Sequence, residues 1–331
     1  MNTLIIAAVN RESGKTVVAL GIALNHPGKV DYIKPIRGAL VKVEGEVRER
    51  DAYLVHHALG LEGTGSDGSP ISLGPSQGVD AEALVARLRE LARGSDLLLV
   101  ETGQTAEMGL NEGVSAFDLG KALGEDLVLV TDASVQNLDT VLMMCEYAGT
   151  KGVGIKGVVV NNDRDGRLAD LLRAKGIPVL GTVPHEPRLA TFRVREILEE
   201  VGGECVAGST GLERMVENVV IGAMTVDTAL PIMRRIPGKC LITGGDRSDL
   251  QLAALTTDTA CLVLTGGIRP NSHVMAEAHD QGVPVIVIAG HTYQVAERFE
   301  RLETRIHPDD GEMLAVIREL IGGNVDLDGL R

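Results

Sequence analysis

Residues 1–20, MNTLIIAAVNRESGKTVVAL, decide the fold of the first half of this chain. An apolar run over residues 4–9 ends at the polar loop NRES (10–13), and GKT (14–16) opens a helix-like segment over 17–24. A strand, a loop and a helix N-terminus in this order are typical of a phosphate-binding P-loop. The first N–H groups of a helix have no internal partner and carry partial positive charge, so they favour phosphate oxygens.

The motif predicts ATP and Mg²⁺ as cofactors, with Lys15 on the outer phosphates and Thr16 on the metal ion. The residues that we expect to bind the cofactor here are Ser13, Gly14, Lys15, Thr16 and Val17. One feature argues against this interpretation, because the first glycine of the usual motif would fall at Val9, or at Ala8 in a longer loop. The alternative is an ordinary strand-to-helix turn with a surface lysine.

Composition limits the classes of partner. The 331 residues suggest about two domains, and 44% hydrophobic residues with 2% aromatics and no Trp predict aliphatic cores. The formal net charge of −14 would repel nucleic acid, so we expect none as a partner.

The sequence also indicates a cytoplasmic protein. An apolar stretch of about 18 residues is absent, so we expect no membrane span, and the short N-terminal apolar run indicates no signal peptide. The cysteines form no metal-binding spacing and are expected to be reduced, packed thiols; they are Cys145, Cys205, Cys240 and Cys261.

Alternating strand-like and helix-like segments predict an α/β fold, with a doubly wound, mostly parallel sheet in a first domain, 1–188, and a smaller α/β domain, 189–331. The predicted strands are 4–9, 30–34, 96–101, 127–131, 153–160, 179–183, 219–223, 240–243, 261–264 and 285–288. The clearest predicted helices are 81–92, 138–148, 167–175, 229–235, 249–256, 274–280, 294–302 and 311–321. The tail, 322–331, is expected to fray.

Four further features extend the nucleotide interpretation. Lys34 and Glu101 each end a predicted strand, where side chains of a parallel sheet reach the ligand crevice, and Asp51 opens a helix. Glu101 is placed to order a magnesium ion. The alternatives are a solvated lysine, a helix N-terminal charge for Asp51, and a cap or salt bridge for Glu101. Asn161 and Asn162 end another strand and could read an adenine edge or make a turn.

This constellation resembles dethiobiotin synthetase over residues 1–186, a family that phosphorylates a carbamate with Mg·ATP. The resemblance implies catalytic roles for Lys15, Lys34 and Glu12, metal ligation by Thr16, Asp51 and Glu101, and base recognition by Asn161 or Asn162. Three segments depart from the family pattern, 8–9, 36–39 and 101–105. Nucleotide binding survives these departures more easily than recognition of the biotin precursor does.

The second half carries the residues that give the DRTGG domain its name, Asp246, Arg247, Thr265, Gly266 and Gly267. The order of the two domains resembles the N-terminal half of long phosphate acetyltransferases, without their acyltransferase domain. The resemblance implies a regulatory portion and a homodimer. For the motif itself, a ligand pocket and a structural or dimer contact both stay open.

Our leading hypothesis is therefore an Mg·ATP-binding protein with a regulatory or dimerising DRTGG domain. Its expected context, by resemblance, is acetyl-phosphate and acetyl-CoA metabolism, with an enzyme of acetate metabolism as a partner. One alternative is an ATP-dependent ligase that activates a carboxylate or carbamate. Another is an interaction module with a degenerate P-loop, as the missing glycine at Ala8 or Val9 would suggest.

Overall fold

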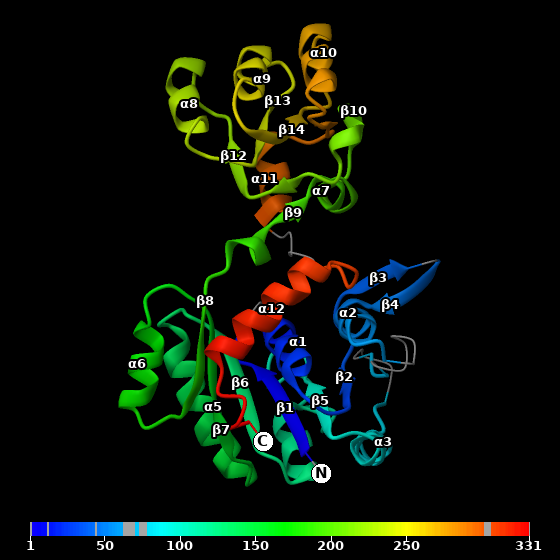
Figure 1. Ribbon diagram of the computed structural model, residues 1–331, viewed down its shortest axis with the longest axis vertical. Coiled ribbons are helices and arrows are strands. Elements are labelled where there is room, and N and C mark those ends of the chain that lie inside the picture. The colour runs from blue at the N-terminus through cyan, green and yellow to red at the C-terminus, as the bar shows by residue number, and fades with distance from the viewer. Residues whose placement is uncertain are drawn as a thin grey trace. The chain divides into compact units, whose positions relative to one another are not determined.

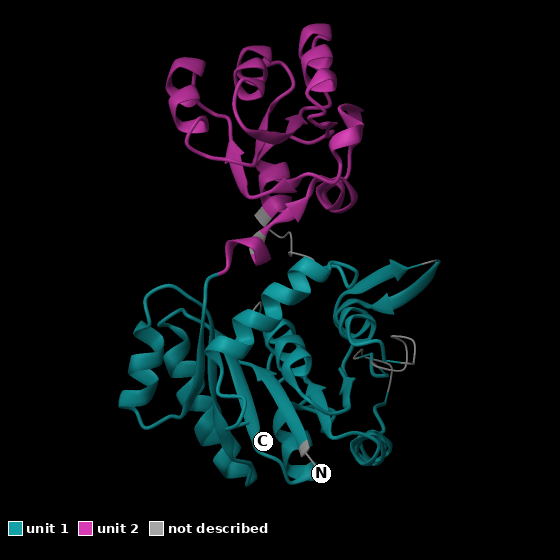
Figure 2. Ribbon diagram, viewed as in Figure 1, with its two compact units in different colours: residues 1–185, 306–331 teal, residues 186–305 magenta. Residues whose placement is uncertain are grey.

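The computed structural model describes residues 2–11, 13–43, 45–61, 70–72, 78–300 and 306–330. The chain divides into two compact units (Figure 2). Unit 1 comprises residues 1–185 and 306–331, and unit 2 comprises residues 186–305. The first boundary lies within three residues of the predicted one, whereas the return of the chain to unit 1 was not predicted.

Unit 1 is built on a six-stranded sheet in the order β2-β5-β1-β6-β7-β8, and every neighbouring pair is parallel. Its strands are β1 (Asn2–Ala8), β2 (Val30–Ile33), β5 (Leu97–Glu101), β6 (Leu127–Asp132), β7 (Ile155–Asp163) and β8 (Val179–Pro184). The central strands are buried on both faces, as their unbroken Val, Leu and Ile runs predict. The doubly wound α/β prediction is confirmed.

Helices cover both faces of this sheet (Figure 1). One face shares a core with α3 (Ala81–Arg93), α4 (Ala116–Leu123), α5 (Asn137–Lys151) and α6 (Arg167–Ala174). α1 (Lys15–Asn25) contacts β1, β5 and β6 and packs against α12 (Gly311–Asn324) and α2 (Arg50–Ala58). A hairpin that the sequence did not reveal, β3 (Leu40–Val43) with β4 (Glu46–Glu49), leads directly into α2.

The position of α12 corrects two predictions, that residues 189–331 form the second domain and that the tail frays. Ile321 is fully buried against α1, where a Cβ added to Gly21 would lie 2.2 Å from its Cγ1. The tail continues this contact, since Val325 forms an antiparallel bridge with Gly181 of β8 and Lys156 donates to the carbonyl of Leu330 at 2.7 Å. The apolar face of the helix therefore belongs to the core of unit 1.

Unit 2 has a five-stranded sheet in the order β10-β15-β14-β13-β12, in which β10 is antiparallel to its neighbour and the other pairs are parallel. The strands are β10 (Glu204–Ala207), β12 (Asn218–Ile221), β13 (Lys239–Gly244), β14 (Thr259–Thr265) and β15 (Val285–Val287). One face packs on α7 (Val194–Val201) and α11 (Thr292–Glu300), and the other on α8 (Val226–Met233), α9 (Ser248–Leu255) and α10 (Ser272–Asp280). The smaller elements are η1 (Pro187–Ala190), η2 (Ser209–Gly211) and the antiparallel pair β9 (Phe192–Arg193) and β11 (Met215–Val216).

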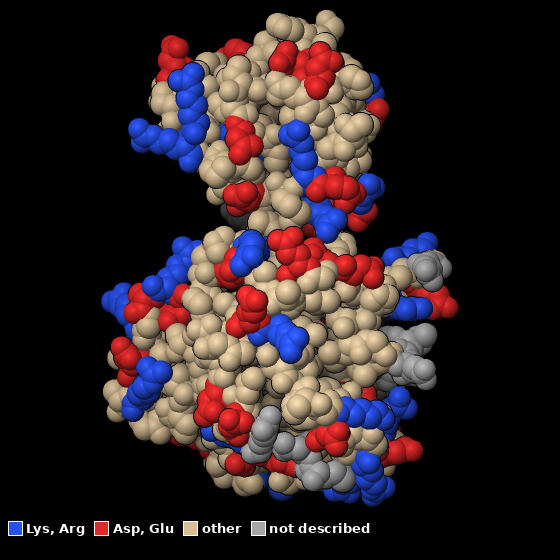
Figure 3. All heavy atoms as spheres, viewed as in Figure 1, with Lys and Arg blue, Asp and Glu red and all other residues tan. Residues whose placement is uncertain are grey.

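The cysteines are free thiols, as predicted. Cys240 and Cys261 are register partners on β13 and β14, and burial raises the pKa of Cys240 well above its usual value. Acidic and basic side chains are interspersed on the face drawn in Figure 3. Among the described residues, every helix is too short or too polar to cross a bilayer.

Candidate functional site

The P-loop connects β1 to α1, and Gly14 fixes its last turn. Gly14 has a φ of +75° and stands at the N-cap of α1, a backbone conformation that glycine adopts without steric cost. A Cβ at this position would lie 2.1 Å from Nδ2 of Asn161. That amide donates to the carbonyl of Ser13 at 3.0 Å. Asn161, at the end of β7, therefore holds the loop from the side.

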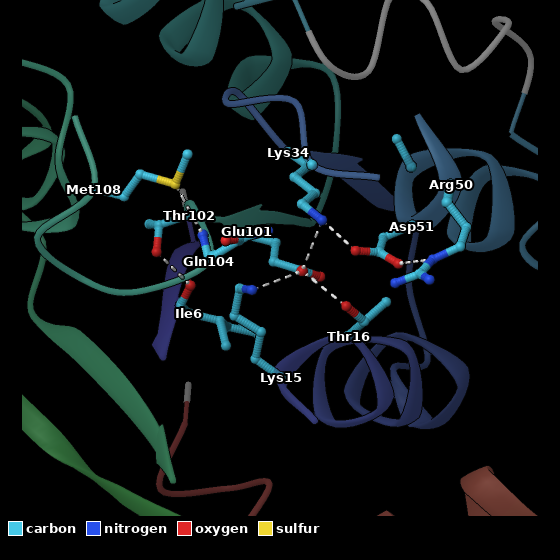
Figure 4. A network of polar contacts seen from close by, with 12 residues as sticks. Ile6, Lys15, Thr16, Lys34, Arg50, Asp51, Glu101, Thr102, Gln104 and Met108 are labelled. Carbon is cyan, nitrogen blue, oxygen red and sulfur yellow. Dashed lines mark hydrogen bonds and ion pairs between the residues drawn. The ribbon is translucent and has the colours of Figure 1, made fainter. Parts of the chain in front are cut away.

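Glu101 lies where two P-loop side chains and a lysine from the next strand meet (Figure 4). Its carboxylate is fully buried at the end of β5. Oε1 accepts a hydrogen bond from Thr16 at 2.8 Å and lies 3.4 Å from Nζ of Lys15 and 3.7 Å from Nζ of Lys34. The structure thus brings three of the predicted site residues within reach of one carboxylate oxygen of a fourth, Glu101.

Lys34 is enclosed by carboxylates. Besides Glu101, its ammonium contacts Oδ2 of Asp51 and lies 2.9 Å from Oε1 of Glu49, the residue that caps α2 by accepting from Ala52. Burial opposes the charge on Lys34, but the three carboxylates outweigh it and raise the pKa of Lys34 above its usual range. Burial likewise opposes ionisation of Asp51, yet Lys34 and Arg50 hold the pKa of that carboxyl below its usual value.

Sequence reasoning missed Glu49 and Tyr32. Burial raises the pKa of Glu49 despite the attraction of Lys34. The Tyr32 hydroxyl donates to Oε2 of Glu101 at 2.8 Å, and burial followed by the charge of Glu101 raises the pKa of Tyr32 well above its usual value. The hydroxyl therefore keeps its proton. Tyr32 lies two residues before Lys34, but strand spacing alone does not reveal its partner on β5.

A second polar cluster braces the other side of the P-loop. Asn10 donates to Oδ2 of Asp132 at 2.6 Å, and Asn137 donates to Oδ1 of the same carboxylate at 2.8 Å. The N–H of Val9 also bonds to the carbonyl of Val130 at 2.9 Å. At Val9, where the usual motif has a glycine, the chain thus continues the strand pairing of β1 with β6.

The remaining predicted residues separate into three cases. Asn162 has a φ of +56° and is exposed, and its side chain contacts Nδ1 of His185 at 2.5 Å, so it does not share the P-loop contact of Asn161. Val17 lies in the first turn of α1. Glu12 lies outside the described residues.

The donors present suit a magnesium–nucleotide complex. Thr16, Asp51 and Glu101 offer hard oxygen ligands, which Mg²⁺ prefers together with phosphate oxygens and water. The described residues contain no group of three acidic, His or Cys side chains that could hold a metal alone. The buried Oγ of Ser13, within the loop itself, has no protein partner. These residues therefore fit a metal that arrives with its nucleotide.

The DRTGG residues lie at the ends of β13 and β14, and they have partners inside unit 2. Arg247 donates to the carbonyl of Met224 at 3.0 Å and pairs with Asp249, while Thr265 contacts Thr292 at 2.9 Å. Gly266 and Gly267 have positive φ and donate to the carbonyls of Gly290 and Ile288, respectively, and Asp246 is exposed. These contacts favour the structural interpretation of the motif over a ligand pocket.

Comparison with protein families matches both halves. Residues 2–192 match the AAA domain family AAA_26, and residues 196–302 match the DRTGG domain. Similar curated proteins include the phosphate acetyltransferases of Pseudomonas putida, 25% identical over 98% of this chain and 51% of that protein, and of Deinococcus radiodurans, 26% identical over 98% and 50%. The chain spans about half the length of the curated relatives it matches.

Two solved structures illustrate distant likeness. The MinC:MinD cell division protein complex of Aquifex aeolicus is 16% identical, with a TM-score of 0.41 over 57% of this chain and 84% of that chain. The CBS and DRTGG domains of Clostridium perfringens pyrophosphatase, complexed with diadenosine tetraphosphate, are also 16% identical, with a TM-score of 0.29 over 49% and 84%.

Proposed function

The chain belongs to the AAA_26 family of AAA domains over residues 2–192 and carries a DRTGG domain, and from this premise we propose that it binds Mg·ATP at the β1–α1 loop. The observation that carries the proposal is the meeting of Lys15 and Thr16, at the start of α1, with Glu101 at the end of β5. Lys15 would contact the outer phosphates, and Thr16 with Glu101 and Asp51 would order the metal. The metal would supply charge neutralisation between the phosphates and these carboxylates.

Calorimetric titration with ATP in excess magnesium tests the proposal. We expect Lys15→Ala to weaken ATP binding by at least about tenfold, because its ammonium is a charged phosphate ligand. Lys121→Ala is the matched control, since Lys121 is an exposed lysine on α4. Equal ATP affinity in Lys15→Ala, Lys121→Ala and wild type would contradict a nucleotide site at this loop.

We further propose that the protein regulates acetyl-phosphate or acetyl-CoA metabolism as a homodimer. The support is the resemblance of almost the whole chain to about half of phosphate acetyltransferases. Titration of the purified chain into phosphate acetyltransferase should change the rate of acetyl transfer, and light scattering should give the mass of a dimer. An unchanged rate and a monomeric mass would contradict this role.

A second candidate function is an ATP-dependent ligase. The observation in its favour is Lys34, which matches the second lysine of the dethiobiotin synthetase pattern and lies 3.7 Å from Glu101. Because Lys34 already contacts three carboxylates, an acidic acceptor would have to displace one of them. A ligase predicts that one carboxylate or carbamate in a panel accelerates phosphate release. Slow hydrolysis that no acceptor stimulates would exclude it.

A further inference from the structure

The two oxygens of the Glu101 carboxylate have different surroundings. Oε1 is on the P-loop side, with the Thr16 hydroxyl at 2.8 Å and both site lysines within 4 Å. Oε2 accepts a hydrogen bond from the Tyr32 hydroxyl at 2.8 Å. This hydrogen bond fixes the plane of the carboxylate, because any turn about its terminal bond short of a half-turn leaves a buried hydroxyl unpaired.

Tyr32 is itself held in place. Its side chain is among the largest fully buried ones of the chain, and it lies on β2 opposite Leu99 of β5, two residues before Glu101. His56 of α2 contacts the Tyr32 carbonyl through Nε2 at 2.8 Å, and the two rings pack edge-on with centroids 5.8 Å apart. Neither the ring nor the hydroxyl is free to follow a rotation of the carboxylate.

We propose that Tyr32 is a positioning residue for the magnesium ion, because it holds Oε2 of Glu101 and so fixes Oε1 as the oxygen that faces the metal beside Thr16. The inference rests on the proposed Mg·ATP site. Partners that orient a ligating carboxylate set metal affinity without touching the metal. Mg²⁺ is sensitive to such orientation since it requires near-octahedral geometry. Without Tyr32, Lys15 and Lys34 would compete for both carboxylate oxygens.

The test is the magnesium dependence of ATP binding in Tyr32→Phe, which removes the hydroxyl and keeps the ring. ATP affinity is measured calorimetrically with excess Mg²⁺ and with EDTA. We expect the ratio of the two affinities to fall about tenfold relative to wild type, while the affinity in EDTA stays unchanged. Tyr147→Phe is the control, because Tyr147 packs edge-on against Phe117 on the opposite face of the sheet.

An unchanged ratio in folded Tyr32→Phe would overturn the inference, and so would an equal loss of affinity with and without magnesium, which indicates a general structural role. Wild type that binds no ATP in either condition would instead refute the proposed site itself. The double variant Tyr32→Phe with Glu101→Gln adds a direct check. If Tyr32 acts through Glu101, its removal has no further effect on the ratio in the Glu101→Gln protein.

A second measurement needs no substitution at position 32. The chain has four tyrosines, so 3-fluorotyrosine labelling in a Tyr53→Phe, Tyr147→Phe, Tyr293→Phe background leaves one ¹⁹F signal. That signal should shift on addition of Mg·ATP and much less with ATP in EDTA. The same shift in both conditions would overturn the inference.

Discussion

Gly14 has a φ of +75°, and a Cβ at this position would clash with the side chain of Asn161. One added methyl group would therefore strain the backbone and disturb the contact between Asn161 and the P-loop. We expect Gly14→Ala to reduce ATP affinity by at least about tenfold, because the loop must move away from the Ser13–Asn161 hydrogen bond. Gly166→Ala is the control, with a φ of +71° and open space around its Cβ. Equal ATP affinities in Gly14→Ala and Gly166→Ala would contradict this role of Gly14.

Lys34 is the cation that lets two buried carboxylates, Glu49 and Glu101, share one site with the partly buried Asp51. Lys34→Met should lower the free energy of unfolding by about 3 kcal/mol at pH 7, because Glu49, Asp51 and Glu101 lose their shared partner. Urea unfolding measures this value. Exposed Lys121→Met should change it by no more than about 0.5 kcal/mol.

The loss of stability in Lys34→Met should depend on pH. The pKa of Lys34 is raised in the folded protein, so its contribution to stability is complete below the unfolded pKa of about 10.4 and is lost as pH rises toward the folded pKa. The stability difference between wild type and Lys34→Met should therefore stay constant up to about pH 10 and narrow as the pH rises from about 10.5 to about 12. A difference that stays constant over this range would contradict the cause assigned to the shift.

At the scale of elements, much of the site could be predicted because strand ends of a parallel sheet meet at one edge. Lys15 and Thr16 come after β1, Lys34 follows β2, and Glu101 ends β5. In the sheet, β5 lies between β2 and β1. Glu49 and Tyr32 escaped prediction because their roles depend on a hairpin and on a contact across strands. Asn161 and Asn162 could not be separated, since successive strand residues point to opposite faces and the sequence does not show which of the two amides faces the P-loop.

The packing of α12 against α1 could not be predicted from the sequence. Ile321 is fully buried and packs over Gly21 of α1. Ile321→Ala should cost about 2–5 kcal/mol of unfolding free energy and accelerate hydrogen exchange in α1. Glu319→Ala, at an exposed position of the same helix, should do neither. Unchanged exchange in α1 would contradict the packing described.

For the whole molecule, the two-domain architecture was predictable from the alternation of strands and helices, and the first boundary fell close to residue 185. The return of residues 306–331 to unit 1 was not, because periodicity shows that a helix is amphipathic but not which core it joins. Both units thus carry complete sheets with helices on two faces. Along the chain, unit 2 is inserted between β8 and α12 of unit 1.

We propose above all that this chain binds ATP as its magnesium complex through Lys15, Thr16 and Glu101. The most direct measurement is a calorimetric titration of the wild-type chain with ATP, first in excess Mg²⁺ and then in EDTA. We expect ATP to bind in the presence of magnesium and to bind at least about tenfold more weakly in EDTA. Absence of binding in both conditions, or equal affinity in both, would contradict binding of ATP as its magnesium complex.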